Sequence, residues 1–163
     1  MKRSLLLILP FCFLMIGCTQ NEPNITGYVM DKNDESVLIV SNHSADYGST
    51  GSSEGFYDAV TASNALDEVK IGDLVEVWYA DGVRETYPAQ ATIGTLNVIP
   101  SEQPEGADLT KSEVLDKILP QYSPENHPLG VKSIYYDENQ DTWSIILRSL
   151  FDEVDYSHKI LDE

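Results

Sequence analysis

Hydrophobic residues alternate with polar ones, or form short β-branched runs, over much of the first hundred residues. Two such segments lie between Ile25 and Val40, and turn-forming residues at 31–35 separate them, which predicts a β-hairpin. Residues 42–55 are rich in serine and glycine and do not predict regular structure. Residues 56–63 then fit either another strand or a short helix.

The strongest strand signal lies between residues 71 and 99. Residues 74–80 form an apolar run that ends at Asp81-Gly82, a pair that favours a tight hairpin turn, so we expect residues 83–87 to form the returning strand. Pro88 ends that strand, and residues 93–99 alternate again. Five or six strands within residues 25–100 predict a small OB-like β-barrel domain.

The pattern becomes helical after a linker at 101–108. Thr110 and Glu113 have the spacing of a capping box, and apolar residues on one helical face follow until Pro120. Residues 131–136 and 142–150 predict two strands, while residues 151–163 fit either a helix or a strand. The expected fold class is therefore mainly β: a five- or six-stranded OB-like barrel, followed at 109–163 by a small α+β annex, a helix plus a hairpin.

The first residues of the chain have the pattern of an export signal. Lys2 and Arg3 precede an apolar run over residues 5–16, which is too short to span a bilayer, and the run ends just before Cys18. This order resembles a lipoprotein signal box, in which the cysteine is lipidated and becomes the first mature residue. We expect a signal peptide at 1–17 and a lipidated tether at 18–24; the alternative is an ordinary signal peptide that is cleaved elsewhere.

Charge narrows the range of partners. The chain has 27 acidic against 10 basic side chains, a net charge of −17, and removal of Lys2 and Arg3 with the signal leaves 8 basic ones, a net charge of −19. Such acidity argues against a nucleic-acid partner, because phosphate binding needs clustered lysine and arginine. A diacylglyceryl anchor supplies the expected membrane partner and places the protein at the cell membrane, on its extracytoplasmic face.

No assembled catalytic or metal-binding group is found in the sequence. Cys12 leaves with the signal, and His43, His127 and His158 lie far apart without the spacing of a metal site. Residues 137–141 begin like a calcium loop, but the glycine and the closing glutamate are missing, so a hairpin turn is favoured. We therefore predict no cofactor, no metal, no catalytic residue and no enzymatic activity.

Exposed aromatic residues are the best candidates for a binding surface. Strand alternation places Val75, Val77 and Tyr79 on the core face of residues 74–80 and turns Trp78 outward. Burial of Trp78 beneath the annex is the alternative. The candidate surface for a ligand or partner comprises Trp78, Arg84, Tyr87 and Trp143.

Three segments carry a family resemblance: residues 25–29 (ITGYV), 69–78 (VKIGDLVEVW) and 82–91 (GVRETYPAQA). Together they resemble the YobA-like family of Bacillales lipoproteins, which implies an OB-like domain of unknown function over residues 25–99 and no catalytic residues. The annex faintly resembles a PepSY-type unit, in which a helix precedes a hairpin whose second strand opens with tryptophan, here Trp143. PepSY units are thought to restrain secreted peptidases.

We therefore expect a lipid-anchored envelope lipoprotein that acts without catalysis, by binding a small ligand or an envelope protein through its barrel. One alternative is a PepSY-like regulator or inhibitor of a secreted or membrane peptidase. Another is an acidic cation-binding protein.

Overall fold

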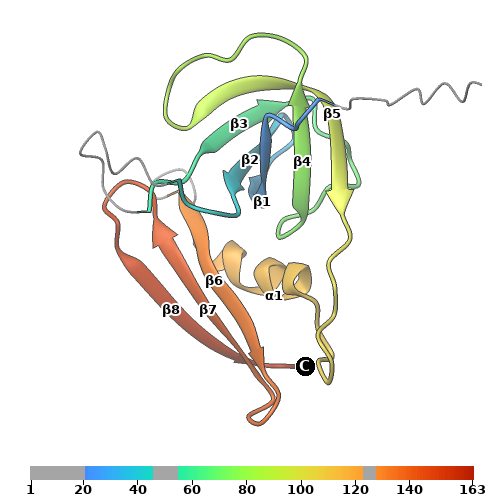
Figure 1. The fold of residues 1–163 in the computed structure, drawn as a ribbon, viewed down its shortest axis with the longest axis vertical. Helices are drawn as coiled ribbons and strands as arrows, with labels where there is room; N and C mark the ends of the chain where they lie inside the picture. The colour runs from blue at the N-terminus through green and yellow to red at the C-terminus, as the bar shows by residue number, and fades with distance from the viewer. Residues whose placement is uncertain (1–20, 46–54, 123–127) are drawn as a thin grey trace, which may run out of the picture.

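The computed structural model describes residues 21–45, 55–122 and 128–163, and it contains a β-barrel above a helix and a small sheet (Figure 1). The expected signal peptide, Cys18, His127 and most of the serine- and glycine-rich segment lie outside the described residues. No helix in the part that is described is long and apolar enough to cross a membrane.

The barrel contains five strands, as predicted: β1 (Ile25–Lys32), β2 (Ser36–Ser41), β3 (Ala59–Ser63), β4 (Leu74–Tyr79) and β5 (Ala89–Ile99). They close in the order β1-β2-β3-β5-β4, an OB-like arrangement. The long strand β5 completes the closure, because its first part pairs parallel with β3 and its second part pairs antiparallel with β4. The hairpin of β1 and β2 is confirmed, and residues 56–63 supply a strand rather than a helix.

The predicted hairpin at Asp81-Gly82 is wrong. The partner of β4 is β5, and residues 80–88, which we call the β4–β5 loop, do not form a strand; they contact β5 through a backbone hydrogen bond from Ala80 to Thr92 and a bridge between Arg84 and Gln90. Residues 83–87 offer little to the core, since Val83 is 41% exposed, whereas Ile93 and Leu96 of β5 are buried. Burial of the apolar side chains therefore selects the longer connection over the local turn signal.

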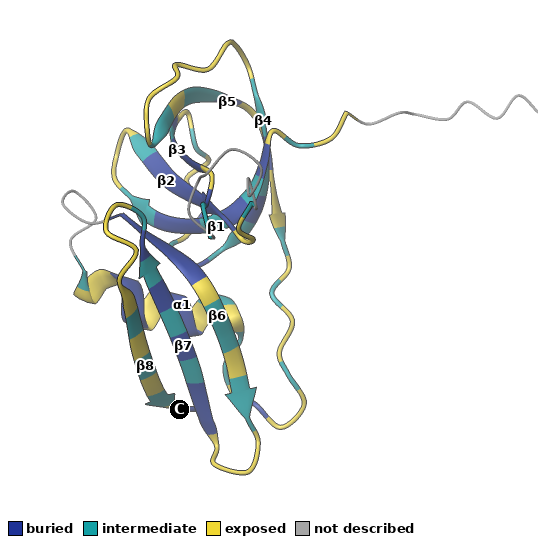
Figure 2. Ribbon diagram, turned by 60° about the vertical axis from the view of Figure 1, so that its left-hand side comes forward, coloured by how far each residue is buried: buried dark blue, intermediate teal, exposed yellow. Residues whose placement is uncertain are grey.

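The annex contains α1 (Lys111–Ile118), a short 3-10 helix η1 (Leu119–Gln121), and a sheet of β6 (Leu129–Asp137), β7 (Thr142–Ser149) and β8 (Asp155–Leu161) in that order. The capping box is confirmed, because the Thr110 side chain accepts from the Glu113 N–H while the Glu113 carboxylate accepts from the Thr110 N–H. The sheet contains the two strands of the expected hairpin and a third strand, β8, which lies within residues 151–163, the segment that fitted either a helix or a strand. Tyr156 and Ile160 of β8 pack against the core, and partly buried residues alternate with exposed ones along this strand (Figure 2).

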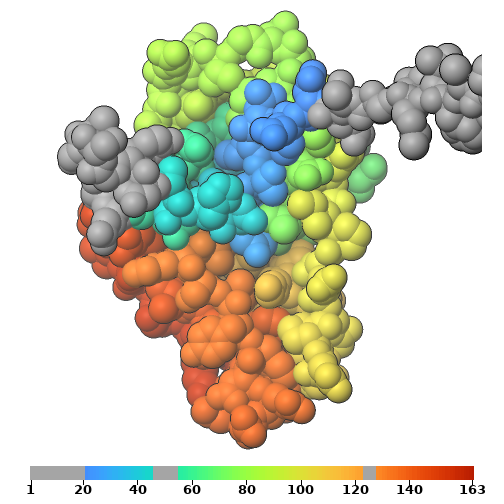
Figure 3. All heavy atoms as spheres, in the orientation of Figure 1, coloured from blue at the N-terminus to red at the C-terminus, as the bar shows by residue number. Residues whose placement is uncertain are grey.

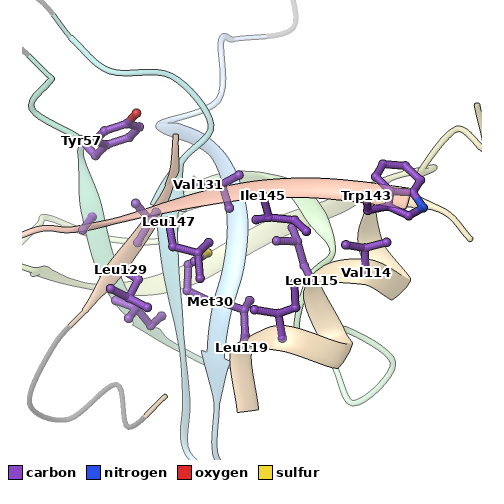
Figure 4. Packing of buried hydrophobic residues seen from close by; sticks show 14 of the residues in the cluster. Met30, Tyr57, Val114, Leu115, Leu119, Leu129, Val131, Trp143, Ile145 and Leu147 are labelled. Carbon is purple, nitrogen blue, oxygen red and sulfur yellow. The ribbon is translucent and has the colours of Figure 1, made fainter. Parts of the chain in front are cut away.

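The barrel and the annex share one hydrophobic core. Met30 of β1, Leu38 and Val40 of β2, and Tyr57 before β3 pack in one cluster with α1 and the inner face of the annex sheet (Figure 4). Strand β2 is buried on both sides, since Val37 and Ile39 fill the barrel while Leu38 and Val40 face the annex, which explains its uninterrupted apolar run.

A glycine permits the close contact between the barrel and α1. Gly72, just before β4, has a φ of +88°, and a Cβ atom there would lie 2.4 Å from the Ser112 carbonyl oxygen. The neighbouring Asp73 carboxylate accepts a 2.9 Å hydrogen bond from the Ser112 hydroxyl. The first turn of α1 is thereby fixed on the connection between β3 and β4.

Candidate functional site: a groove at the end of the barrel

The four predicted surface residues do not form one site. Trp78 points away from the barrel interior and is half-buried, and its indole N–H donates a 2.8 Å hydrogen bond to the Asn21 carbonyl. Trp78 is not among the residues of the shared core, and its hydrogen bond joins it to the segment that precedes β1.

Trp143 belongs to the core and not to a surface. Its side chain is 0% exposed because Trp143, Ile145 and Leu147 form the inward row of β7 against α1. The indole N–H donates a 2.8 Å hydrogen bond to the Asp162 carboxylate, which satisfies the polar atom of this buried ring. The assignment of Trp143 to a ligand surface is therefore corrected.

Arg84 and Tyr87 both lie on the β4–β5 loop, which forms the top of the molecule in Figures 1 and 3. The Arg84 guanidinium donates to the Gln90 side chain at 3.1 Å. The Tyr87 hydroxyl donates to the Tyr57 carbonyl at 2.7 Å. These bonds join the loop to β5 and to the segment that leads into β3.

A groove of about 500 Å³ lies between this loop and the open end of the barrel. We call it the barrel-end groove, and its main lining side chains are Phe56, Asp58, Tyr79, Val83, Glu85 and Tyr87. Its volume falls within the range of about 300–1,000 Å³ that is typical of small-molecule sites. Of the predicted surface residues, only Tyr87 lines it.

Aromatic rings form one side of the barrel-end groove. The Tyr87 ring lies 5.2 Å from the Phe56 ring and 6.1 Å from the Phe151 ring of the annex, measured between ring centroids. Such tilted and edge-on pairs add stability beyond simple burial. Tyr87 is nevertheless 37% exposed, so part of its ring faces the groove.

Burial and the Asp58 carboxylate both act on the tyrosines of the groove. Burial, and to a smaller degree the negative charge of Asp58, together raise the pKa of Tyr87 to about 12. Burial and then Asp58 also raise the pKa of Tyr79. One carboxylate therefore acts on both phenols, and both tyrosines are protonated at neutral pH.

Backbone hydrogen bonds hold the floor of the groove. The Asn24 N–H donates to the Val77 carbonyl at 2.8 Å, and the Asn24 side chain accepts from the Tyr79 N–H at 2.8 Å. In the loop, the Thr86 hydroxyl donates to the Pro88 carbonyl at 2.8 Å. These bonds fix the floor of the groove and its loop side in the chain without a ligand.

Sequence reasoning missed Phe56, Asp58 and Tyr79 as members of this site. Phe56 and Asp58 reach the loop only because β3 pairs in parallel with β5, a long-range pairing that no local pattern announces. Tyr79 is the last inward residue of β4, so it stands at the mouth of the barrel rather than deep inside it. A tyrosine at the end of an inward-facing row was the signal available in the sequence.

The other side chains considered as ligands or catalytic groups are hydrogen bonded within the fold. The Asp137 carboxylate accepts from the Asn139 N–H at 3.0 Å, and Asp141 accepts from the Tyr136 hydroxyl at 2.8 Å, as in a tight hairpin turn. The His158 ring is hydrogen bonded to the Tyr122 hydroxyl. Within residues 21–45, 55–122 and 128–163, no group of three or more histidine, cysteine, aspartate or glutamate side chains is arranged to hold a metal ion.

Residues 26–100 match a family described as protein of unknown function (DUF3221). The match covers the barrel and stops before the annex, and it confirms the expectation of an uncharacterised domain over these residues. No curated protein and no solved structure matches the chain.

Proposed function

We propose that this protein is a lipid-anchored envelope lipoprotein that acts without catalysis, and that its OB-like barrel binds a small ligand or a peptide segment in the barrel-end groove. The observation that carries the proposal is the groove itself, a concave site with a fixed floor and a partly exposed aromatic wall. Concave, mostly apolar sites with a few placed polar groups are where proteins commonly bind small molecules.

The chemistry of the groove favours binding over proton transfer. A general base at neutral pH needs a pKa near 7, whereas burial and the charge of Asp58 raise the pKa of Tyr87 to about 12. The pKa of Tyr79 is raised as well. The two phenols therefore serve as apolar walls and neutral hydrogen-bonding groups.

The proposed location rests on the N-terminal sequence. Lys2, Arg3, the apolar run and Cys18 occur in the order of a lipoprotein signal, and the three segments noted above favour the YobA-like lipoproteins as the specific family. Cys18→Ala is expected to release the protein from the membrane fraction. Unchanged membrane retention of that variant would refute lipid anchoring.

The binding site is tested with the mature chain carrying Cys18→Ser, so that it stays in solution. A library of small polar, aromatic and peptide ligands is screened by two-dimensional NMR. Val83→Trp should block binding, because Val83 is 41% exposed on the rim of the groove, and Val98→Trp is the matched control, since Val98 is 42% exposed on β5 away from it. Ligands that bind equally well to both variants would place the site elsewhere.

A second candidate function is regulation of a secreted or membrane peptidase by the annex. It is favoured by a helix that packs on a sheet whose middle strand begins Thr142-Trp143, as in the PepSY-type resemblance. The purified mature chain should then change peptidase activity in an envelope extract. Identical activity with and without the chain, at a large excess of chain, would exclude this function.

A further inference from the structure

The charge of the barrel-end groove points to one class of ligand. Asp58 and Glu85 both line it, and both side chains are exposed to solvent. None of the described residues that line it is a lysine, arginine or histidine. The groove therefore presents a negative site, and the net charge of the whole chain, −17, adds to the attraction of cations.

Two basic side chains lie beside the groove without lining it. The Arg148 guanidinium lies next to Gly55 and is paired with Asp155 at 2.7 Å. Arg84 directly precedes Glu85 in the sequence, but its guanidinium donates to the Gln90 side chain, and Arg84 does not line the groove. The negative charge of Asp58 acts on Tyr79 and Tyr87, so this carboxylate lies within electrostatic reach of both rings.

Aromatic rings next to carboxylates suit an organic cation better than a hydrated metal ion. A ring face attracts a cation that lies within about 6 Å of its centroid, and this attraction is strongest for weakly hydrated groups such as quaternary ammonium. Phe56, Tyr79, Val83 and Tyr87 provide apolar contact for the carbon atoms of such a ligand. A metal ion would need several oxygen ligands, which the described groove residues do not assemble.

We propose that the barrel-end groove binds a ligand that carries an alkylammonium or guanidinium group on an apolar stem, with Asp58 and Glu85 facing the charge and the tyrosine rings contacting the charged group and the stem. This inference rests on the proposed function of the groove, and adds to it the chemical class of the ligand.

The test compares choline with 3,3-dimethyl-1-butanol, which has nearly the same shape but carries no charge. Both are titrated into the mature Cys18→Ser chain, and amide shifts are followed by NMR. We expect choline to shift amides at 56–59, 79 and 83–87 and to bind at least fivefold more tightly than the neutral compound. Raising the salt concentration should weaken choline binding, because the contact is electrostatic and solvent-accessible.

Charge-removing variants identify the groups responsible. Asp58→Asn and Glu85→Gln should each weaken choline binding by roughly twofold to fivefold, the scale of an exposed charge contact. The matched control is the pair Glu105→Gln and Asp116→Asn, two exposed carboxylates that do not line the groove. Melting temperatures confirm that each variant is folded, and the uncharged compound should bind to all of them equally.

Three results would overturn the inference. Equal affinity for choline and its neutral analogue would leave a binding groove that does not select charge, so the proposed function would stand and the ligand class would fall. Equal weakening by the control pair would show attraction to the acidic chain in general. No response to either compound would also reject the ligand class, and the library screen with Val83→Trp then decides separately whether the groove binds anything.

Discussion

Leu115→Ala tests whether the barrel and the annex fold as one unit. Leu115 lies on α1, is 0% exposed and belongs to the cluster that both parts share. The substitution removes three buried carbon atoms, worth about 2.4 kcal/mol at about 0.8 kcal/mol for each methylene-sized group. The unfilled cavity raises the expected loss in unfolding free energy to about 3–5 kcal/mol. For a chain of this size that loss lowers the melting temperature by about 6–20 °C.

The two tryptophans of the chain allow each part to be followed separately, since Trp78 lies in the barrel and Trp143 in the annex. Urea unfolding is monitored by fluorescence in chains that keep one of them, and Leu115→Ala should shift both transitions by the same amount. Leu66→Ala is the matched control, because Leu66 is 49% exposed, and it should cost less than about 1 kcal/mol. A shift of the Trp143 transition alone would refute the shared core.

Three further predictions concern single polar groups. Asp162 accepts hydrogen bonds from the Trp143 indole and from two backbone N–H groups. Burial by itself raises the pKa of Asp162, but these hydrogen bonds outweigh burial and lower the pKa below 3.8. Asp162→Asn should therefore reduce the melting temperature at neutral pH. That reduction should fade as the pH falls through the lowered pKa; a constant reduction at every pH would contradict the carboxylate's role. The phenol of Tyr87 should ionise near pH 12, so Tyr87→Phe should remove one tyrosine from the high-pH phase of an ultraviolet titration. The stability that this phenol supplies below pH 10.0 should be lost by about pH 12. An unchanged high-pH phase in the variant would show that Tyr87 titrates normally. The Lys32 ammonium donates to three backbone carbonyls of residues 66–69. Lys32→Met should therefore lower the free energy of unfolding by about 1–3 kcal/mol and speed amide exchange at 66–69. Unchanged amide exchange would show that these hydrogen bonds do not stabilise the segment.

The sequence predicts an element correctly where its local pattern and its packing in the fold favour the same structure. The capping box at Thr110 depends only on hydrogen bonds between residues three apart, so it can be predicted without knowledge of the fold. The apolar run of β2 indicated a strand, but its burial on both sides depends on the annex and was not predictable from the run alone.

The errors arise where distant segments decide the outcome. Asp81-Gly82 is a good turn signal, yet β5 buries more apolar surface against β4 than residues 83–87 would. The sequence does not indicate that Trp143 is buried, because the packing of α1 against the inner face of β7 cannot be predicted from the residues around Trp143. The barrel-end groove joins the ends of β1, β3, β4 and β5, and these meet only once the barrel has closed.

The barrel-end groove is the proposed binding site, and a crystal structure of the mature chain with a ligand found in the NMR screen tests this directly. We predict ligand density between Tyr79, Tyr87 and Asp58, with any positively charged group on the side of the carboxylate. A ligand bound elsewhere, for example on the outer face of the annex sheet beside the exposed Tyr135, with the groove empty, would contradict it.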